Sequence, residues 1–313
     1  MLRVSIRQLR VFVTVARHLS FARAAEELHL SPPAVSMQVG ELESAIEVPL
    51  FERSGRRVSL TTAGEYFLVH ARRLLANLKD AEDTIARLKG VQTGRVTIGV
   101  LSTAKYFVPR LLAEFMREHP GLDLRLEVSN RQSLSELLAR NELDVAVMGT
   151  PPRELDLRVE PFAAHPLGVI AAPEHPLVTL PHVPPALLER EPFIVRESGS
   201  GTRAAMERYF AEARIKPPVV MEMASNETIK QAVIANMGIS FLSLHTTGLE
   251  LETGLIKVLD VDGLPLVRRW QVVHLRAKLL SPAAEAFRYY VLEHGGRLLA
   301  KMFPSLVVAP AER

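Results

Sequence analysis

Four short segments of the sequence place small polar residues where a buried strand gives way to a helix. They are "LSTAKYF" (101–107), "NRQS" (130–133), "ESGSGTR" (197–203) and "ASNETIK" (224–230). Unpaired backbone N–H groups and the helix dipole favour an anion at such positions. Ser, Thr and Asn cap helices in every class of protein, so one segment alone means little. Four equivalent segments favour a binding site for a phosphate or a carboxylate.

A cation accompanies each of these segments, namely Lys105, Arg131, Arg203 or Lys230. The glycines of "SGSGT" let the backbone approach a ligand closely. That segment is not a P-loop, because it lacks the G-x-x-x-x-G-K-[ST] spacing. The residues therefore indicate a small anion without distinguishing phosphate from carboxylate.

The elements that must position these segments begin at Gly94, where strands and helices start to alternate. We expect strands at 95–101, 122–129, 143–149, 166–172, 192–197, 219–225, 238–244 and 270–276. We expect helices at 105–120, 133–142, 228–237 and 282–299, and one after "SGSGT". This order predicts a parallel, doubly wound α/β fold in two lobes, with hinges near Phe162 and 265–268. Ligands of such folds bind between the lobes, at the carboxyl ends of the strands.

The first 50 residues show a different pattern, of short helices with tight joints. A helix is expected at 8–18 and another at 21–28, with Ser20 as its N-cap. Ser31 should cap a third helix, whose first turn tolerates Pro32 because N–H groups there lack intrahelical partners. The inward residues are Ala24, Ala25, Val35, Val39 and Leu42. A plain three-helix cap is the alternative, but the short polar outward residues of the third helix suit base edges and favour a helix-turn-helix.

The segment "FERSGRRVSL" (51–60) reads as a hairpin around Ser54–Gly55 that carries Arg53, Arg56 and Arg57. Such a basic wing beside a helix-turn-helix grips phosphates or a minor groove.

A long helix should follow the wing, capped by Thr62 with Glu65 and ending near Lys89. Its apolar residues recur in steps of four and three, at Phe67, Ala71, Leu74, Leu78, Ala81, Ile85 and Leu88. This spacing predicts a coiled-coil seam that pairs two chains; a helix lying on its own domain is the alternative. A dimer would present two reading heads to an approximately palindromic site.

The stretches "FARAAEELHLSPPAVSMQVGELE" and "LFERSGRRVSLTTAGE" resemble the winged helix-turn-helix of LysR-type transcriptional regulators. The sequence departs from that pattern at Pro32, where Gln is frequent, and at Gly40, where a basic residue is frequent nearby. The resemblance implies contacts with double-stranded DNA from Ser31, Pro33, Ser36, Met37, Gln38, Arg53, Arg56 and Arg57.

The second part, with "NELDVAVMGTPPRELD" and "SNETIKQAVIANMGISFLSLHT", resembles the regulators of Calvin-cycle carbon-fixation operons, the Rubisco operon activators. The resemblance implies an effector domain related to periplasmic solute-binding proteins, and a phosphorylated metabolite or reduced nicotinamide nucleotide as effector. We assign the effector site to Ser102, Thr103, Lys105, Asn130, Arg131, Met148, Glu197, Thr202, Arg203, Asn226 and Glu227.

Composition and the remaining motifs narrow the function class. A net charge of +3 and no cysteine fit a localised DNA-binding patch and a reducing cytosol, without disulfides or a thiol nucleophile. No apolar run of membrane-spanning length and no export signal is present. His165, His175 and His182 match no zinc spacing and are expected at the surface or in caps. Asp144 is expected to be structural, and Ser198, Ser200 and Thr202 lack a nucleophile elbow.

We therefore expect a non-enzymatic, cytoplasmic regulator without metal or cofactor. Its expected fold is an all-α winged helix-turn-helix (1–61), a dimerisation helix (62–90) and a two-lobed α/β effector domain (91–313). Lobe I should comprise about 91–161 and 268–300, and lobe II about 162–267. Expected partners are DNA, a small anion, further copies of the chain in a homodimer or homotetramer, and RNA polymerase. A regulator that senses a carboxylate for another operon, and a cytosolic solute-binding protein, are the alternatives.

Overall fold

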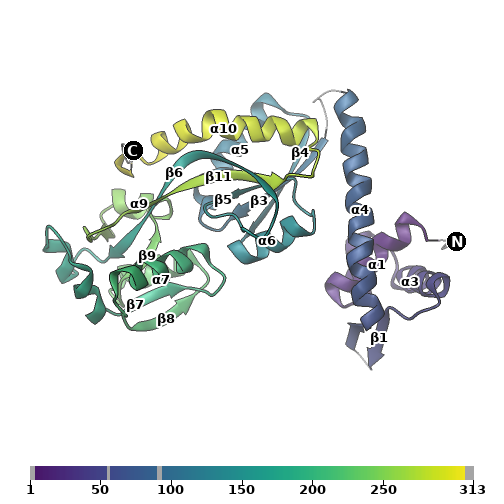
Figure 1. The fold of residues 1–313 in the computed structure, drawn as a ribbon, viewed down its shortest axis with the longest axis horizontal. Helices are drawn as coiled ribbons and strands as arrows, with labels where there is room; N and C mark the ends of the chain where they lie inside the picture. The colour runs from purple at the N-terminus through teal and green to yellow at the C-terminus, as the bar shows by residue number, and fades with distance from the viewer. Residues whose placement is uncertain (1–3, 55–56, 90–93, 307–313) are drawn as a thin grey trace. The chain divides into compact units, whose positions relative to one another are not determined.

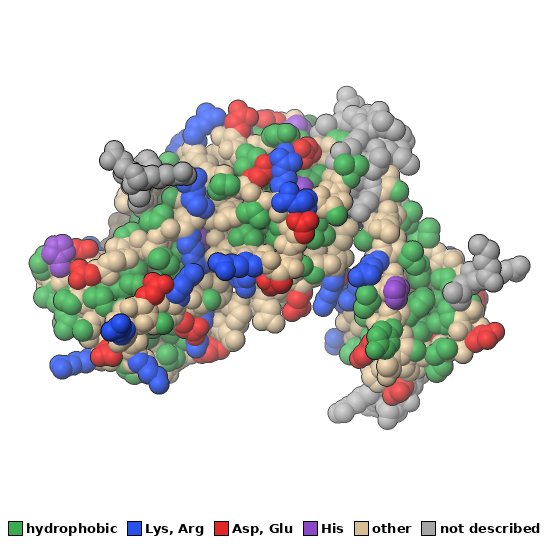
Figure 2. Space-filling view, viewed as in Figure 1, with side chains coloured by type: hydrophobic (Ala, Val, Ile, Leu, Met, Phe, Trp, Pro, Cys, Tyr) green, Lys and Arg blue, Asp and Glu red, His purple; other side chains and the backbone are tan. Residues whose placement is uncertain are grey.

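The computed structural model describes residues 4–54, 57–89 and 94–306. The chain forms two compact units, Met1–Ile85 and Ala86–Arg313, which are described separately below (Figure 1). Basic and acidic side chains intermingle over the face shown in Figure 2, in keeping with a net charge of only +3.

The first unit begins with the three expected helices, α1 (Ile6–His18), α2 (Phe21–Leu28) and α3 (Pro32–Ile46). The Ser20 hydroxyl accepts the N–H of Arg23, and the Ser31 hydroxyl accepts that of Ala34, so both predicted caps are confirmed. The predicted inward residues are buried in one cluster with the apolar face of α1: Ala24, Ala25, Val35, Val39 and Leu42.

The wing is an antiparallel hairpin of β1 (Phe51–Ser54) and β2 (Arg57–Leu60). The Glu43 carboxylate accepts the N–H groups of Leu50 and Phe51, at 2.7 and 3.0 Å. These bonds tie the start of the wing to α3, so helix and wing form one body.

Helix α4 (Thr62–Lys89) has the predicted length. Its first turn is capped one residue earlier than expected, because the hydroxyl of Thr61, not that of Thr62, accepts the N–H of Gly64 at 2.9 Å. The predicted capping box between Thr62 and Glu65 is therefore wrong.

The apolar seam predicted along α4 serves two surfaces. Ala71 is fully buried in the core of its own unit, and the ring of Phe67 packs edge-on against Phe12 at 5.3 Å. Leu74 is 55% exposed. The last two expected positions fall among side chains that the structure does not describe. The seam prediction was wrong for Phe67 and Ala71, because a helix anchored in a three-helix core must give one face to it.

The second unit is built on a seven-stranded sheet in the order β10-β6-β11-β5-β3-β4, with β9 also paired to β6 (Figure 1). The strands of lobe I are β3 (Gly94–Leu101), β4 (Leu122–Ser129) and β5 (Val145–Met148). Its helices are α5 (Val108–Glu118), α6 (Arg131–Ala139) and the C-terminal α10 (Pro282–Met302). The three strands are parallel, and the helices bury one continuous core against them.

Two long strands connect the lobes without a break. Strand β6 (Leu157–Ala171) pairs with β11 (Leu266–Leu275) from Leu157 to Leu167, and its far end continues into pairing with β9 (Ser240–Ser243) and β10 (Lys257–Val258). All of these pairings are antiparallel. The expectation of a wholly parallel sheet is therefore wrong, and both strands begin well before the predicted segments because they span two lobes.

Lobe II completes the unit with a small parallel sheet and its own helices. The strands are β7 (Phe193–Arg196) and β8 (Val219–Met223), and the helices are α7 (Gly201–Ala213), α8 (Asn226–Ile234) and α9 (Gly248–Glu252). Two apolar clusters fill the lobe, one on each face of the part of the large sheet that contains β9.

A buried ion pair attaches the segment that precedes α10 to the sheet of lobe I. Lys278 and Asp144 are each 1% exposed, their charged atoms lie 2.9 Å apart, and the Asp144 carboxylate also accepts the N–H of Thr97 at 2.7 Å. The prediction that Asp144 is structural is confirmed.

Replacing Lys278 by Met should destabilise the protein by about 3–5 kcal/mol, because it leaves a buried carboxylate without its countercharge. Arg276→Met is the matched control, since Arg276 pairs with Asp156 at the surface, where the two side chains are 64% and 76% exposed. Its cost should stay below about 1 kcal/mol. Urea unfolding of both variants measures the difference, and equal costs would contradict this account of the pair.

Candidate functional site

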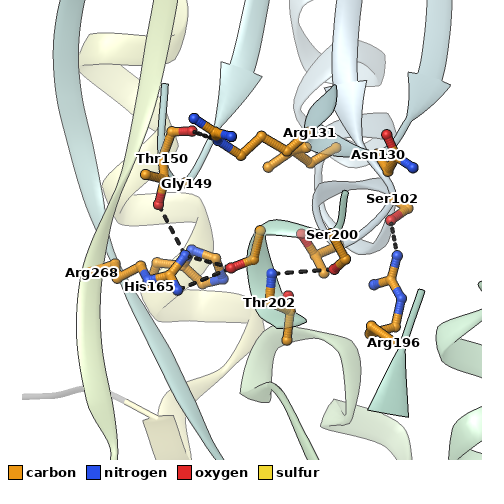
Figure 3. Close-up of a pocket in the computed structure, with 13 residues that line it drawn as sticks. Ser102, Asn130, Arg131, Gly149, Thr150, His165, Arg196, Ser200, Thr202 and Arg268 are labelled. Atoms are coloured by element: carbon orange, nitrogen blue, oxygen red, sulfur yellow. Dashed lines mark hydrogen bonds between the residues drawn. The ribbon is translucent and has the colours of Figure 1, made fainter. Parts of the chain in front are cut away.

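A cavity lies between the lobes of the second unit, where the strand ends of both lobes converge (Figure 3). Its lining residues are Leu101, Ser102, Thr103, Asn130, Arg131, Gly149, Thr150, His165, Arg196, Ser200, Gly201, Thr202 and Arg268. We call it the inter-lobe cavity. Its inner volume is about 20 Å³, room for about one water molecule. A larger ligand would need the lobes to move apart, and we call the arrangement in this structure closed in that sense.

Three of the four segments singled out in the sequence line the inter-lobe cavity, and the fourth, 224–230, contacts it only through Asn226. Ser102 and Thr103, Asn130, and Thr202 contribute three of its walls, and Asn226 reaches Ser102 with a hydrogen bond of 3.3 Å to its carbonyl. Helices α6, α7 and α8 begin at these segments as predicted. No α-helix begins at Thr103, because a single 3-10 turn follows it and α5 starts later. That predicted helix start is wrong.

Arg268 dominates the electrostatics of the cavity. Its Nη1 atom donates to the Thr150 hydroxyl at 2.9 Å, and both Nη atoms donate to the Gly201 carbonyl at 3.1 and 3.0 Å (Figure 3). Its Nε is buried without a partner, and no carboxylate in the described part of the chain forms an ion pair with it. Burial, followed by repulsion from Arg208 and Arg131, lowers the pKa of Arg268 to about 10.

Arg196 holds the lobes together at the other side of the cavity. It is 3% exposed, donates to the Ser102 hydroxyl at 3.1 Å and to the Asn226 side-chain oxygen at 2.6 Å, and pairs with Glu197 at 2.8 Å. Glu197 also accepts from Asn130 of lobe I, at 3.5 Å. Arg196 is therefore charge-compensated, whereas Arg268 is not.

Other predicted residues lie elsewhere. Lys105 and Glu227 line a second, larger cavity, in which Lys230 pairs with Glu227 at 3.2 Å and with Glu250 at 2.7 Å. Arg203 forms ion pairs on the flank of α7, with Glu207 at 2.6 Å and Glu222 at 2.9 Å. Met148 is fully buried in the core of lobe I. These four predicted residues do not line the inter-lobe cavity, and neither do Glu197 and Asn226, which lie behind its wall beside Arg196.

The sequence reasoning missed Arg196, Arg268 and His165. A detectable signal existed for Arg196, a charge at the carboxyl end of the buried strand "FIVR". For Arg268 there was none, since two successive arginines on a strand do not reveal which one faces inward. His165 was expected at the surface, and that prediction is wrong: it is 2% exposed and stacks on Trp270 at 3.8 Å. The expectation for His175, a capping residue, is confirmed.

In the first unit, the predicted DNA-reading residues lie along the start of α3. Ser31 and Pro33 are exposed, Met37 is 57% exposed, and the Gln38 amide donates to Glu41 at 3.1 Å. Ser36 is half-buried on the same helix. A side chain at Gly40 would meet no atom within 4 Å, so its helix surface is open.

The predicted phosphate contacts belong to the wing. Arg53 and Arg57 stand on β1 and β2. Arg56 lies outside the described residues.

Comparison with known proteins assigns the family. The model of the "Bacterial regulatory helix-turn-helix protein, lysR family" matches residues 6–65, and that of the "LysR substrate binding domain" matches residues 89–296. The chain belongs to the LysR-type transcriptional regulators. It is 52% identical to the regulator CfxR of Cupriavidus necator, over 97% of this chain and 96% of that protein. It is 49% identical to a RuBisCO operon transcriptional regulator of Allochromatium vinosum, over 96% of this chain and 99% of that protein.

Solved structures agree with this membership. The regulatory domain of Synechocystis PCC6803 CcmR, solved in complex with 2-PG, is 41% identical with a TM-score of 0.63, over 64% of this LysR-type chain and 97% of that one. Full-length CbnR, solved with its target DNA, shares the fold with a TM-score of 0.54 at 22% identity, over 93% of this chain and 99% of that one.

No helix among the described residues combines the length and apolarity needed to cross a membrane. Within the same residues, no group of three or more His, Cys, Asp or Glu side chains could hold a metal ion.

Ser36→Ala and Gln38→Ala should each relax or abolish site preference, because both side chains belong to α3, the helix that we expect to meet base edges. Arg56→Ala should instead weaken binding to all DNA. It should also reduce the slope of log affinity against log salt concentration by about 1, as the loss of one phosphate contact does. Selection from a random DNA pool, followed by salt titrations, measures both effects. Unchanged preference in both α3 variants would contradict the assigned readout.

Proposed function

We propose that this LysR-type regulator activates carbon-fixation genes in response to a small phosphorylated anion bound in the inter-lobe cavity. It works in the cytoplasm as a homodimer or homotetramer, contacts RNA polymerase, and catalyses no reaction. The similarity to RuBisCO operon regulators supports the target genes, and the 2-PG complex of the CcmR domain supports the effector class.

The observation that carries the effector assignment is the uncompensated charge of Arg268. A partly buried guanidinium without a carboxylate is costly, and an anion at that place lowers the cost. Arg131 lines the same cavity, and its Nε donates to the Thr150 carbonyl at 3.0 Å. Among the residues that the structure describes, neither arginine forms an ion pair with a carboxylate. Two cations therefore face one small space, together with the Thr202 and Thr103 side chains.

Binding must be coupled to lobe opening, because the closed cavity has no room for an anion larger than water. Arg268 and Arg196 hold it closed through bonds to Gly201 and Ser102. An anion that takes over these guanidinium groups favours a different lobe arrangement. We propose that this change alters the spacing of the DNA-reading heads, and with it DNA bending.

Arg268→Gln should weaken binding of 2-phosphoglycolate by about 1.5–3 kcal/mol, or about 10- to 150-fold, since one charge-assisted bond and its charge are lost. Arg269→Gln is the control, because Arg269 is the exposed neighbour on the opposite face of β11. Calorimetric titration of the full chain measures both affinities.

Thr202→Val and Thr103→Val extend the same titration to the neutral donors of the cavity. If Arg268→Gln binds as tightly as Arg269→Gln, the anion does not sit in the inter-lobe cavity. If 2-phosphoglycolate gives no heat but a dicarboxylate does, the effector is a carboxylate and the regulator serves another class of operon.

Leu74→Lys should reduce the mass of the protein in solution, because α4 offers this exposed side chain to a second copy and a charge there opposes apolar pairing. Sedimentation at low concentration measures the mass, and operator binding should weaken with it. Arg73→Lys, a neighbour that keeps its charge, is the control. An unchanged mass for Leu74→Lys would contradict pairing through α4.

A further inference from the structure

His165 occupies an unusual position in the wall of the inter-lobe cavity. It lies on β6 directly opposite Arg268 of β11, in the pair of strands that crosses between the lobes. Its ring is 2% exposed and stacks on Trp270, with centroids 3.8 Å apart and planes tilted by 15°. The stack and the strand pairing fix the orientation of the ring.

The two ring nitrogens of His165 differ in their surroundings. Nε2 lies 2.9 Å from the hydroxyl of Ser243 on β9. Nδ1 is buried and has no hydrogen-bond partner in the described part of the protein. Buried polar atoms are nearly always paired in native proteins. An unpaired nitrogen in the wall of a ligand cavity therefore indicates that the ligand supplies its hydrogen-bond partner.

Gly149 is the residue that lies directly beside Nδ1. This glycine also lines the cavity, and a Cβ on it would lie 2.6 Å from Nδ1, closer than any real Cβ contact. Any other residue type at 149 would therefore cover the orphan nitrogen.

We propose that His165 is a ligand-selecting residue of this cavity, whose neutral ring donates its Nδ1–H to an oxygen of the bound anion. The inference rests on the proposed function, which places an anion beside Arg268. A neutral imidazole carries one N–H and one acceptor nitrogen, and a hydroxyl can serve either as donor or as acceptor. The Ser243 hydroxyl can thus donate to Nε2 and leave the proton on Nδ1, the tautomer that an anion prefers.

The surroundings keep the ring neutral. Burial lowers the pKa of His165 well below its ordinary value, and His245 and Arg268 nearby lower it further. The ring fixes the direction of the Nδ1–H bond, and the strength of this bond does not change with the pH of the cell. A neutral donor of this kind selects an anion by the position of its oxygen. His165 would hold one oxygen of the anion in place, while Arg268 supplies the charge.

A matched pair of variants separates this role from a structural one. The amide of Asn stands near the place of Nδ1, whereas the longer Gln places its amide near Nε2. His165→Asn should therefore keep the affinity for 2-phosphoglycolate within about threefold, and His165→Gln should lose about 10- to 100-fold. A residue that serves only to bond Ser243 would give the reverse order. His182→Gln, at an exposed histidine, is the control.

Calorimetric titration of the full chain provides the affinities, with thermal unfolding to establish that each variant is folded. If His165→Gln binds as tightly as His165→Asn, the inference is wrong. If wild type gives no heat and Arg268→Gln is also silent, the proposed function has failed instead.

A crystal structure of the wild-type chain with 2-phosphoglycolate decides the matter even if neither variant folds. A ligand oxygen about 2.7–3.2 Å from Nδ1 is expected. A separation beyond about 3.5 Å would overturn the role of His165.

Discussion

The antiparallel pairing of β6 with β11 is the constraint on which the effector unit depends. Each strand is continuous through both lobes, so the lobes cannot separate as independent bodies without breaking main-chain hydrogen bonds. Movement between them must come from twist and bend of this ribbon. Because His165 and Arg268 face each other on the same two strands, the groups that we propose as anion contacts stand on the element that must deform.

In the first unit, helix α4 has one face buried in the core and another face exposed. One stretch of this helix closes the core beneath the reading helix, with Ala71 fully buried, and Leu74 nearby remains available to another chain. A helix fixed in its own core in this way resists rotation, since turning it would expose buried side chains at a cost of about 25 cal/mol per Å². Changes in pairing through α4 would therefore be felt by the DNA-reading surface.

Local signals in the sequence predicted most elements, because caps and periodicity are local. Ser20 and Ser31 cap their helices as expected. The predictions that were missing or wrong concern contacts between segments that are distant in sequence. Arg268 and Gly201 are far apart in sequence, and no local pattern reveals that the Arg268 guanidinium donates a hydrogen bond to the Gly201 carbonyl. Antiparallel pairing of β6 with β11 likewise depends on a partner a hundred residues away.

The closed cavity also bears on how strongly an effector can act. The Nη atoms of Arg268 donate to Gly201 and Thr150 while its charge remains uncompensated, so this arginine contributes to the closed state through neutral acceptors. An anion offers the same donors a charged acceptor, and charge-assisted bonds are about twice as strong as neutral ones. Moving a two-state equilibrium from 1:99 to 99:1 takes about 5.5 kcal/mol of differential affinity. One arginine cannot supply that, whereas Arg268 and Arg131 acting with the His165 donor come within reach of it.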